Sequence, residues 1–97
     1  MRETRTMEFK ETITNTFLKT VSAFSNYDGG VILFGVDDEG NSKGLSDVKQ
    51  SCLDIENKIN DSISPQPDYK LETQNNDKII KLTVQSGAQK PYLYRSK

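Results

Sequence analysis

Residues 3–45, ETRTMEFKETITNTFLKTVSAFSNYDGGVILFGVDDEGNSKGL, contain the stretch that decides the fold of this chain. Within it, residues 31–36 read VILFGV, an apolar run rich in β-branched and aromatic side chains. A short run of this kind is typical of a strand that is buried on both faces. We therefore expect a central strand here, with Asp37 and Asp38 at its carboxyl end.

The segment before this strand shows two different periods. Residues 5–10 alternate between apolar and polar side chains, which predicts a short strand. Residues 12–26 carry apolar side chains every three or four positions, which predicts an amphipathic helix with Thr12 as its N-cap and an end before Gly29. The apolar stripe of this helix consists of Ile13, Phe17, Leu18, Val21 and Phe24.

The second half of the chain predicts one helix followed by a hairpin. Ser46 is the expected N-cap of the helix, with Asp47 in its first turn, and Pro65 ends the helical region. Residues 69–73 and 80–84 alternate between apolar and polar side chains, which predicts two antiparallel strands. The buried stripe of the helix is expected to be Val48, Cys52, Ile55, Ile59 and Ile63.

The predicted order of elements is β-α-β-α-β-β. It corresponds to an α+β fold in which two helices cover one face of a mixed four-stranded sheet. A chain of 97 residues has room for one hydrophobic core, so residues 1–97 are expected to form a single domain. The sequence contains neither an apolar stretch of membrane-helix length nor a signal peptide, so we expect a cytoplasmic protein without membrane contact.

The chain contains one cysteine, Cys52, and no histidine. This composition excludes an internal disulfide and a Cys/His zinc site, and it excludes the usual Ser/His and Cys/His catalytic pairs. Cys52 is therefore interpreted as a small core residue.

The formal net charge is −1, so composition alone does not indicate a nucleic-acid-binding protein. The charge is unevenly distributed, because residues 28–61 hold eight acidic and three basic residues, and the basic surplus lies towards the two ends. If the ends meet on one face, a basic patch forms there; otherwise these charges are scattered and solvated. The candidate nucleic-acid contacts are Arg2, Arg5, Lys10, Lys90 and Arg95.

Two tyrosines, Tyr92 and Tyr94, alternate with other residues in the sequence KPYLYR at 90–95. Their rings are able to stack on bases, and they are equally able to close the core from an edge strand. The sequence leaves both interpretations open.

Four acids are candidates for a shared metal site: Glu3, Glu8, Asp37 and Asp38. Carboxylates grouped at one site bind Mg²⁺ or Mn²⁺, and such an ion activates water for attack on a phosphodiester. Because Glu3 and Glu8 would lie on opposite faces of a regular strand, the site requires Glu3 to precede the strand or to lie at a bulge. The alternative is that these acids are solvated turn and strand-end residues.

The segment 26–30, NYDGG, joins the first helix to the central strand. Its glycines are interpreted as a helix-ending turn, and alternatively as a close approach to phosphate. The chain contains no G-x-x-x-x-G-K-[ST] sequence, so we expect no Walker-type nucleotide site.

Four motifs follow one another in the first half of the chain: E-x4-E-F-K-E, V-S-A-F-S-N-x-x-G-G, F-G-V-D-D-x-G and a G-L. Together they resemble the Schlafen AlbA-type domain, also called a divergent AAA-type ATPase family, which stands at the N-terminus of many bacterial transcriptional regulators and helicase-related proteins. The resemblance implies an Alba-like sandwich and a DNA-binding role in a transcriptional regulator. Because the family usually continues into a further strand, it also implies that these residues are the N-terminal part of a longer protein.

In eukaryotic Schlafen proteins, an acidic triad with this spacing of glutamates is associated with RNA cleavage. By this resemblance, Glu3, Glu8 and Asp38 would be catalytic residues and ligands of Mg²⁺ or Mn²⁺, with Asp37 as the alternative third acid. Three functions therefore stay open: DNA or RNA binding without a cofactor, metal-dependent endoribonuclease activity, and protein interaction or homodimerisation. Convergence of the three carboxylates would favour the enzyme, and their dispersal would favour binding.

Overall fold

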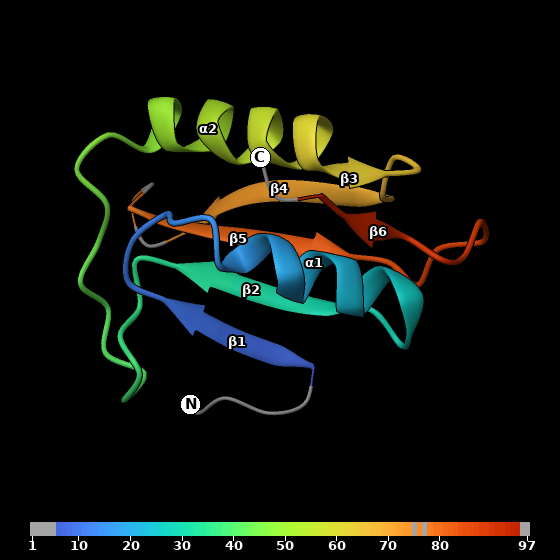
Figure 1. Cartoon of the computed structure of the whole chain (residues 1–97). Helices are drawn as coiled ribbons and strands as arrows, with labels where there is room; N and C mark the ends of the chain where they lie inside the picture. Colours follow the sequence, from blue (N-terminus) through green and yellow to red (C-terminus); the bar gives the residue numbers. More distant parts are fainter. Residues whose placement is uncertain (1–5, 75, 77, 96–97) are drawn as a thin grey trace.

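The computed structural model describes residues 6–74, 76 and 78–95 of the chain (Figure 1). Its main sheet has four strands in the order β1-β2-β5-β4, with β1 parallel to β2 and the other neighbours antiparallel. Both helices pack against one face of this sheet, which confirms the predicted α+β fold. The elements are β1 (Met7–Lys10), α1 (Phe17–Asn26), β2 (Gly30–Phe34), α2 (Val48–Ser62), β3 (Ile63–Ser64), β4 (Tyr69–Gln74), β5 (Ile79–Val84) and β6 (Leu93–Tyr94).

Strand β2 has a buried residue on each face, as its continuous apolar sequence predicts. Ile32 and Phe34 point towards the helices, and Leu33 points to the opposite face, because successive side chains alternate along a strand. Phe34 meets Phe17 of α1 edge to face, with the ring centroids 5.3 Å apart. The core under the helices is formed by Phe17, Leu18, Val21, Phe24, Ile32, Phe34, Ile55, Ile59, Ile63, Ile80, Leu82, Val84 and Tyr92.

The first helix begins at Phe17, so the prediction that it starts after Thr12 was wrong. In the segment before Phe17, the hydroxyls of Thr14 and Thr16 lie 2.9 Å apart and hydrogen-bond to each other. The amide of Leu18 donates to the Asn15 carbonyl at 3.1 Å, which is a turn hydrogen bond rather than a helical one. Threonine hydroxyls compete with helical hydrogen bonding, and β-branched side chains lower helix propensity, so the apolar period alone extends the helix too far.

The second helix is capped by Asp47, and not by Ser46 as predicted. The Asp47 carboxylate accepts a hydrogen bond from the Gln50 amide at 3.1 Å, which satisfies one of the free N–H groups of the first turn. The predicted stripe is confirmed within the helix, since Ile55 and Ile59 are fully buried and Val48 and Cys52 pack partly buried against the core. The last predicted member, Ile63, is buried as well, but it lies in β3 and not in the helix.

The sequence gives no sign of the small second sheet in which β3 pairs antiparallel with β6. Ile63 is the partner of Tyr94, so the end of α2 is joined to the C-terminal segment. Tyr92 is only 3% exposed and belongs to the core, which confirms the edge-strand interpretation for this tyrosine. Strands of two residues are too short to produce a period, and they form here because neighbouring elements hold them together.

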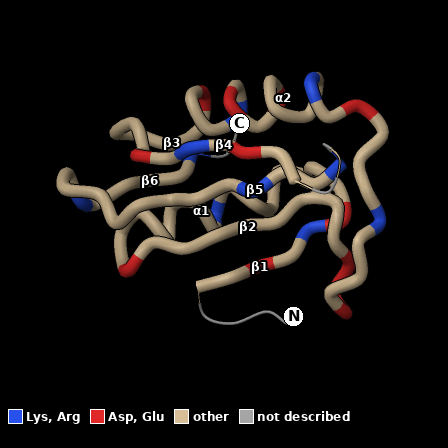
Figure 2. Tube along the Cα trace, turned by 180° about the vertical axis from the view of Figure 1, so that it is seen from behind, with Lys and Arg blue, Asp and Glu red and all other residues tan. Residues whose placement is uncertain are grey.

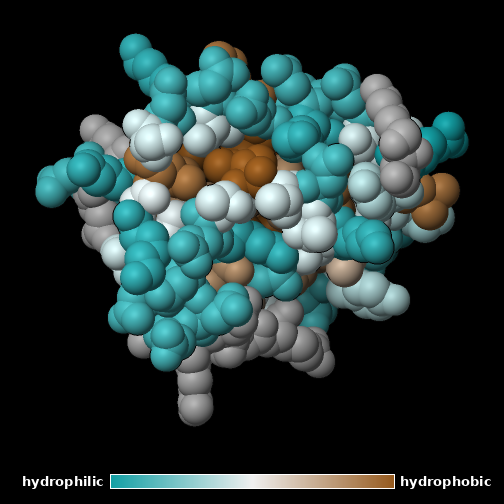
Figure 3. Space-filling model, turned by 60° about the vertical axis from the view of Figure 1, so that its left-hand side comes forward, coloured by the Kyte–Doolittle hydropathy of each residue, from teal (hydrophilic) through white to brown (hydrophobic). Residues whose placement is uncertain are grey.

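Neither helix within the described residues combines the length and apolarity needed to cross a membrane; the longer one, α2, has 15 residues. Figure 3 shows apolar side chains between hydrophilic ones at the end of the molecule where both helices begin. Partly buried apolar residues from this region that pack against the core include Ile13, Leu45, Val48 and Cys52.

Candidate nucleic-acid interface

The predicted basic contacts at the N-terminus are only partly visible in the structure. Arg2 and Arg5 lie outside the described residues. Lys10 lies on β1, and its Nζ is 3.6 Å from Glu8 Oε2 and 3.4 Å from Thr16 Oγ1. The charge of Lys10 is therefore partly compensated within its own strand.

The predicted basic contacts at the C-terminus are exposed, and Lys90 lies away from Lys10. Lys10 pairs with Phe34, the last residue of β2, whereas Lys90 follows Val84, which pairs with the first residue of β2. Lys10 and Lys90 are thus at opposite ends of the sheet. Arg95 follows β6, and its amide donates to a carbonyl at the end of α2. The structure does not bring Lys10, Lys90 and Arg95 together, so their joint role in binding stays a prediction.

Two other lysines, Lys70 and Lys81, lie on the sheet face that carries no helix. Figure 2 shows this side, with α1 behind the strands. Lys81 alternates with the buried residues of β5 and points away from the helices. On β4, Lys70 and Glu72 point to the same open face, because their partners in the register are Thr83 and Lys81. Lys78 stands directly before β5 and is exposed, but its side chain lies beside Gly44 in the loop before α2 and not on the open face.

These lysines were overlooked because the sequence analysis read the hairpin only for its apolar positions. The sequence did contain the signal. Leu71 and Leu82 face the helices, so the charged residues that alternate with them along each strand must face the other way. Acids, by contrast, lie mostly on other parts of the molecule (Figure 2). The described acids on α2 and on the loop after β2 are Asp37, Asp38, Glu39, Asp47, Asp54, Glu56 and Asp61.

The proposed acidic triad is not assembled by the residues that the structure describes. Glu3 lies outside them, and Glu8 Oε2 accepts a hydrogen bond from Thr20 Oγ1 on α1 at 2.8 Å. Asp38 lies in the turn that follows β2, where the Gly40 amide donates to the Asp37 carbonyl at 3.0 Å.

No group of three His, Cys, Asp or Glu side chains with metal-binding geometry occurs among residues 6–74, 76 and 78–95. A site that includes Glu3 is not tested by this finding. The catalytic and metal-binding roles of Glu3, Glu8 and Asp38 therefore stay predictions.

Asp37, the alternative third acid, has a structural role in the tight turn that follows β2. Its carboxylate accepts hydrogen bonds from the amides of Asn41 at 2.9 Å and Glu39 at 3.0 Å, and Lys43 Nζ lies 3.8 Å away. The hydrogen bond from the Asn41 amide is the main cause that holds the pKa of Asp37 below its ordinary value of 3.8.

We expect the carboxyl carbon of Asp37 to titrate by NMR with a midpoint below 3.8. Because the folded pKa is lowered, the charged carboxylate stabilises the fold above its ordinary pKa, and this contribution disappears as the pH falls through the lowered value. Unfolding of Asp37→Asn should therefore differ most from the parent protein at neutral pH, and the difference should shrink in acid. A midpoint at or above 3.8 would contradict this account of the turn.

Gly29 and Gly30 have the backbone conformation and contacts that a turn at the end of α1 requires. Gly29 has a φ of +80°, and its amide donates to the Phe24 carbonyl at 2.9 Å, which closes the end of α1. A Cβ on Gly30 would lie 2.6 Å from the ring of Phe24. Both glycines are thus required by the packing of the helix end against β2.

Ser22 and Asn26 hold the C-terminal segment against α1. They lie one turn apart on the helix, and the Ser22 hydroxyl and the Asn26 amide both donate to the Tyr92 carbonyl at 2.8 Å. The Asn26 side-chain oxygen also accepts from the Tyr92 amide. Asn26 therefore pairs with the backbone of residue 92 as a strand would, and we call Ser22, Asn26 and Tyr92 the clasp.

Cys52 lies on the partly buried side of α2 and packs against the core. Desolvation is the main cause that raises the pKa of its thiol above 9.0, and the nearby charge of Glu56 adds to it. A raised pKa disfavours the reactive thiolate, in agreement with a packing role.

Comparison with known proteins identifies the family of the chain and a protein of similar structure. The sequence profile of the family described as Schlafen, AlbA_2 matches residues 3–97. The solution NMR structure of the N-terminal domain of a RecG-related protein from Nitrosomonas europaea superimposes with a TM-score of 0.65, at 24% sequence identity, over 95% of this chain and 70% of that one. No curated protein matches the sequence. The profile match covers nearly the whole chain, so the protein belongs to the Schlafen AlbA_2 family.

Proposed function

We propose that this domain binds nucleic acid, and that it does so as the DNA-binding module of a longer bacterial transcriptional regulator of the Schlafen type. The observation that carries the proposal is a pair of lysines on the open face of the sheet. Lys70 and Lys81 point to this face beside Glu72, and the acids of α2 and of the loop after β2 lie elsewhere. The family membership and a structural neighbour whose name describes it as related to an ATP-dependent DNA helicase support the same role.

The open face suits weak, backbone-directed binding. Lys70 and Lys81 provide two cations against Glu72, and Lys90 lies in the connection that leaves β5. Lysine ammonium groups attract phosphates without reading sequence. With so few contacts, we expect dissociation constants on the order of 10⁻⁴ to 10⁻⁶ M at physiological salt and a shallow dependence on salt.

Charge reversal on the open face tests this proposal directly. In Lys70→Glu/Lys81→Glu, affinity for a fluorescein-labelled oligonucleotide should fall by roughly tenfold or more, and the slope of log K against log salt should shrink by about two. Fluorescence anisotropy at several salt concentrations measures both quantities. The matched control is Lys19→Glu/Lys49→Glu, which makes the same change in net charge at exposed positions on the two helices.

If the control pair weakens binding as much as the open-face pair, net charge and not this face governs the affinity, and the proposed interface is wrong. If the parent protein binds no oligonucleotide at low salt, the function itself is wrong. Degradation of RNA with Mn²⁺ that Glu8→Gln and Asp38→Asn both abolish would replace binding by the endoribonuclease activity.

A further inference from the structure

Strand β4 is an edge strand of the main sheet, and with six residues it is the longest edge strand in the described part of the chain. An edge strand presents N–H and C=O groups that are able to pair with a strand of another chain. The opposite edge strand, β1, has four residues, and its Glu8 already contacts Thr20 and Lys10. Of the two edges, β4 is therefore better suited to pair with another strand.

The hydrogen bonds of the hairpin show which backbone groups of β4 point outwards. The Gln85 amide donates to the Asp68 carbonyl at 2.9 Å, in continuation of the β4–β5 register. Hydrogen-bonded and non-hydrogen-bonded pairs alternate along an antiparallel ladder, so every second residue from Asp68 onwards points its backbone groups to β5. The N–H and C=O groups of Tyr69 and Leu71 therefore point away from β5. Among residues 6–74, 76 and 78–95, no backbone hydrogen bond from outside the ladder reaches these groups.

The side chains of β4 are complementary to those of a second copy of the same strand. Lys70 and Glu72 are exposed on the open face, and Leu71 lies between them on the helix side. When two such strands run antiparallel with Leu71 opposite Leu71, Lys70 of each copy lies opposite Glu72 of the other. Opposite charges in this position stabilise a sheet, and like charges destabilise it. The outward N–H and C=O groups of Leu71 favour the same register, because they are able to exchange two hydrogen bonds across the axis.

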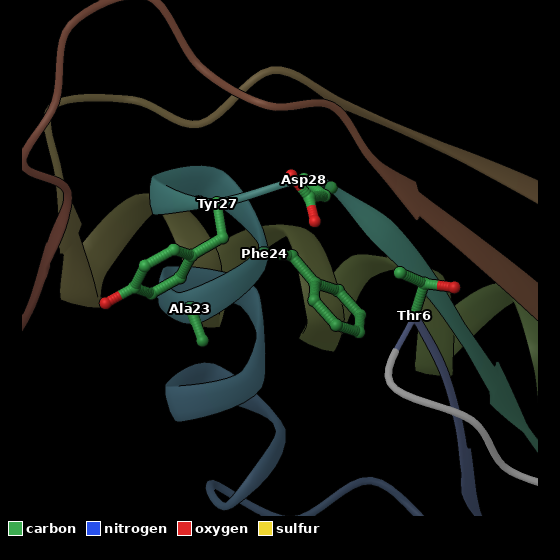
Figure 4. A pocket seen from close by; sticks show the side chains of 6 residues that line it. Thr6, Ala23, Phe24, Tyr27 and Asp28 are labelled. Carbon is green, nitrogen blue, oxygen red and sulfur yellow. The ribbon is translucent and has the colours of Figure 1, made fainter.

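Leu53 of α2 adds an apolar side chain close to this edge. It is 53% exposed, whereas the exposed Tyr27 belongs to the side of β1, where it lines a pocket together with Thr6 (Figure 4). Desolvation and, as a second cause, the charge of Glu56 raise the pKa of the Tyr69 hydroxyl, so Glu56 lies near β4. Leu53 precedes Glu56 by one turn on the same side of the helix and therefore also lies near β4.

We infer that β4 pairs edge to edge with β4 of a second copy of this chain, antiparallel and with Leu71 opposite Leu71, so that Lys70 of each copy forms an ion pair with Glu72 of the other. This is an isologous two-fold interface, in which both copies use the same surface. It joins the two four-stranded sheets into one and places both open faces on the same side. The inference does not depend on the proposed nucleic-acid binding.

The interface is small, because it consists of one pair of strands and the leucines beside them. Small interfaces of this kind are typical of weak, transient association. We therefore expect a dissociation constant on the order of 10⁻⁴ M.

Charge exchange across the two-fold axis tests the inference, with sedimentation equilibrium at up to about 1 mM protein as the measurement. Lys70→Glu and Glu72→Lys each create two like-charge pairs in the interface, and each should weaken self-association about tenfold or more. The double variant Lys70→Glu/Glu72→Lys restores opposite charges and should associate within about threefold of the parent protein. An equimolar mixture of the two single variants should form a heterodimer, because every charge in it again faces its opposite.

Lys19→Glu is the matched control, because it makes the same change in net charge as Lys70→Glu at an exposed position on α1. It should leave self-association unchanged. In the parent protein, the NMR signals of the Tyr69 and Leu71 amides should shift with concentration, since both N–H groups enter the interface. Thermal unfolding of each variant controls for folding, and the exposure of Lys70 and Glu72 predicts little change.

A parent protein that stays monomeric at about 1 mM overturns the inference, and the edge is then open to an extended peptide of another protein. Single variants that associate as the parent does show that the copies meet on a different surface, which also overturns it. The same holds if the double variant and the mixture are as weak as the single variants.

Discussion

Replacement of Gly29 by alanine is expected to destabilise the domain by about 3 kcal/mol or more, because two costs add at this position. The φ of +80° is a left-handed conformation, which costs an L-residue about 1–2 kcal/mol. A Cβ there would also lie 2.7 Å from the Val84 carbonyl oxygen and 3.1 Å from the Ser86 amide, both of which belong to the backbone. Relief of this overlap requires the end of β5 to move, at a typical cost of about 1–3 kcal/mol.

Gly44→Ala provides the matched control. Gly44 has the same φ of +80°, but a Cβ there would meet Lys78 side-chain atoms at 3.5 and 3.6 Å, which is ordinary contact. Chemical denaturation should therefore show a loss of about 1–2 kcal/mol for Gly44→Ala and a clearly larger loss for Gly29→Ala. Equal losses would show that backbone conformation alone explains the double glycine, and that its close approach to β5 is relieved without cost.

The main architecture could be predicted from the sequence because its elements have strong periods. The run at 31–36 is apolar without interruption, and the two strands of the hairpin alternate regularly, so β2, β4 and β5 follow from pattern alone. The start of α1 could not be predicted in the same way. Ile13 fits the helical period and contributes to the core, but it does so from a turn, where threonine side chains take part in local hydrogen bonds.

The candidate site was less accessible to sequence reasoning, since it depends on which strands become neighbours. The basic residues chosen at the chain ends include Lys10 and Lys90, and the register places these at opposite ends of the sheet. Lys70 and Lys81 share a face only once β4 and β5 are paired. The aromatic candidate of the C-terminal segment, Tyr92, is in the core, whereas the exposed ring is Tyr27. Exposure of one aromatic residue and burial of another is set by tertiary packing, which a local period does not encode.

The clasp gives the second large effect: Asn26→Ala should destabilise the domain by about 2–3 kcal/mol. The substitution removes two hydrogen bonds to the backbone of residue 92 in a partly buried place, and it leaves the Tyr92 amide without its acceptor. An unsatisfied buried donor costs about 1–3 kcal/mol, beyond the loss of the bond itself. Ser22→Ala, the matched control, should cost only about 1 kcal/mol, because Asn26 still donates to the same carbonyl.

Hydrogen exchange separates a local from a global effect of the clasp. If Asn26 holds β6 in place, Asn26→Ala should accelerate exchange at Tyr94 and in the paired residue Ile63 much more than in β2 and β5. Similar losses of stability for Asn26→Ala and Ser22→Ala, with uniform exchange, would show that the C-terminal segment is held by the burial of Tyr92 alone. The expected pattern would instead explain the spacing of serine and asparagine in the motif V-S-A-F-S-N. Ser22 and Asn26 lie on one helix face and hydrogen-bond to residue 92, and they thereby stabilise the short β3–β6 sheet, which is too small to be stable alone.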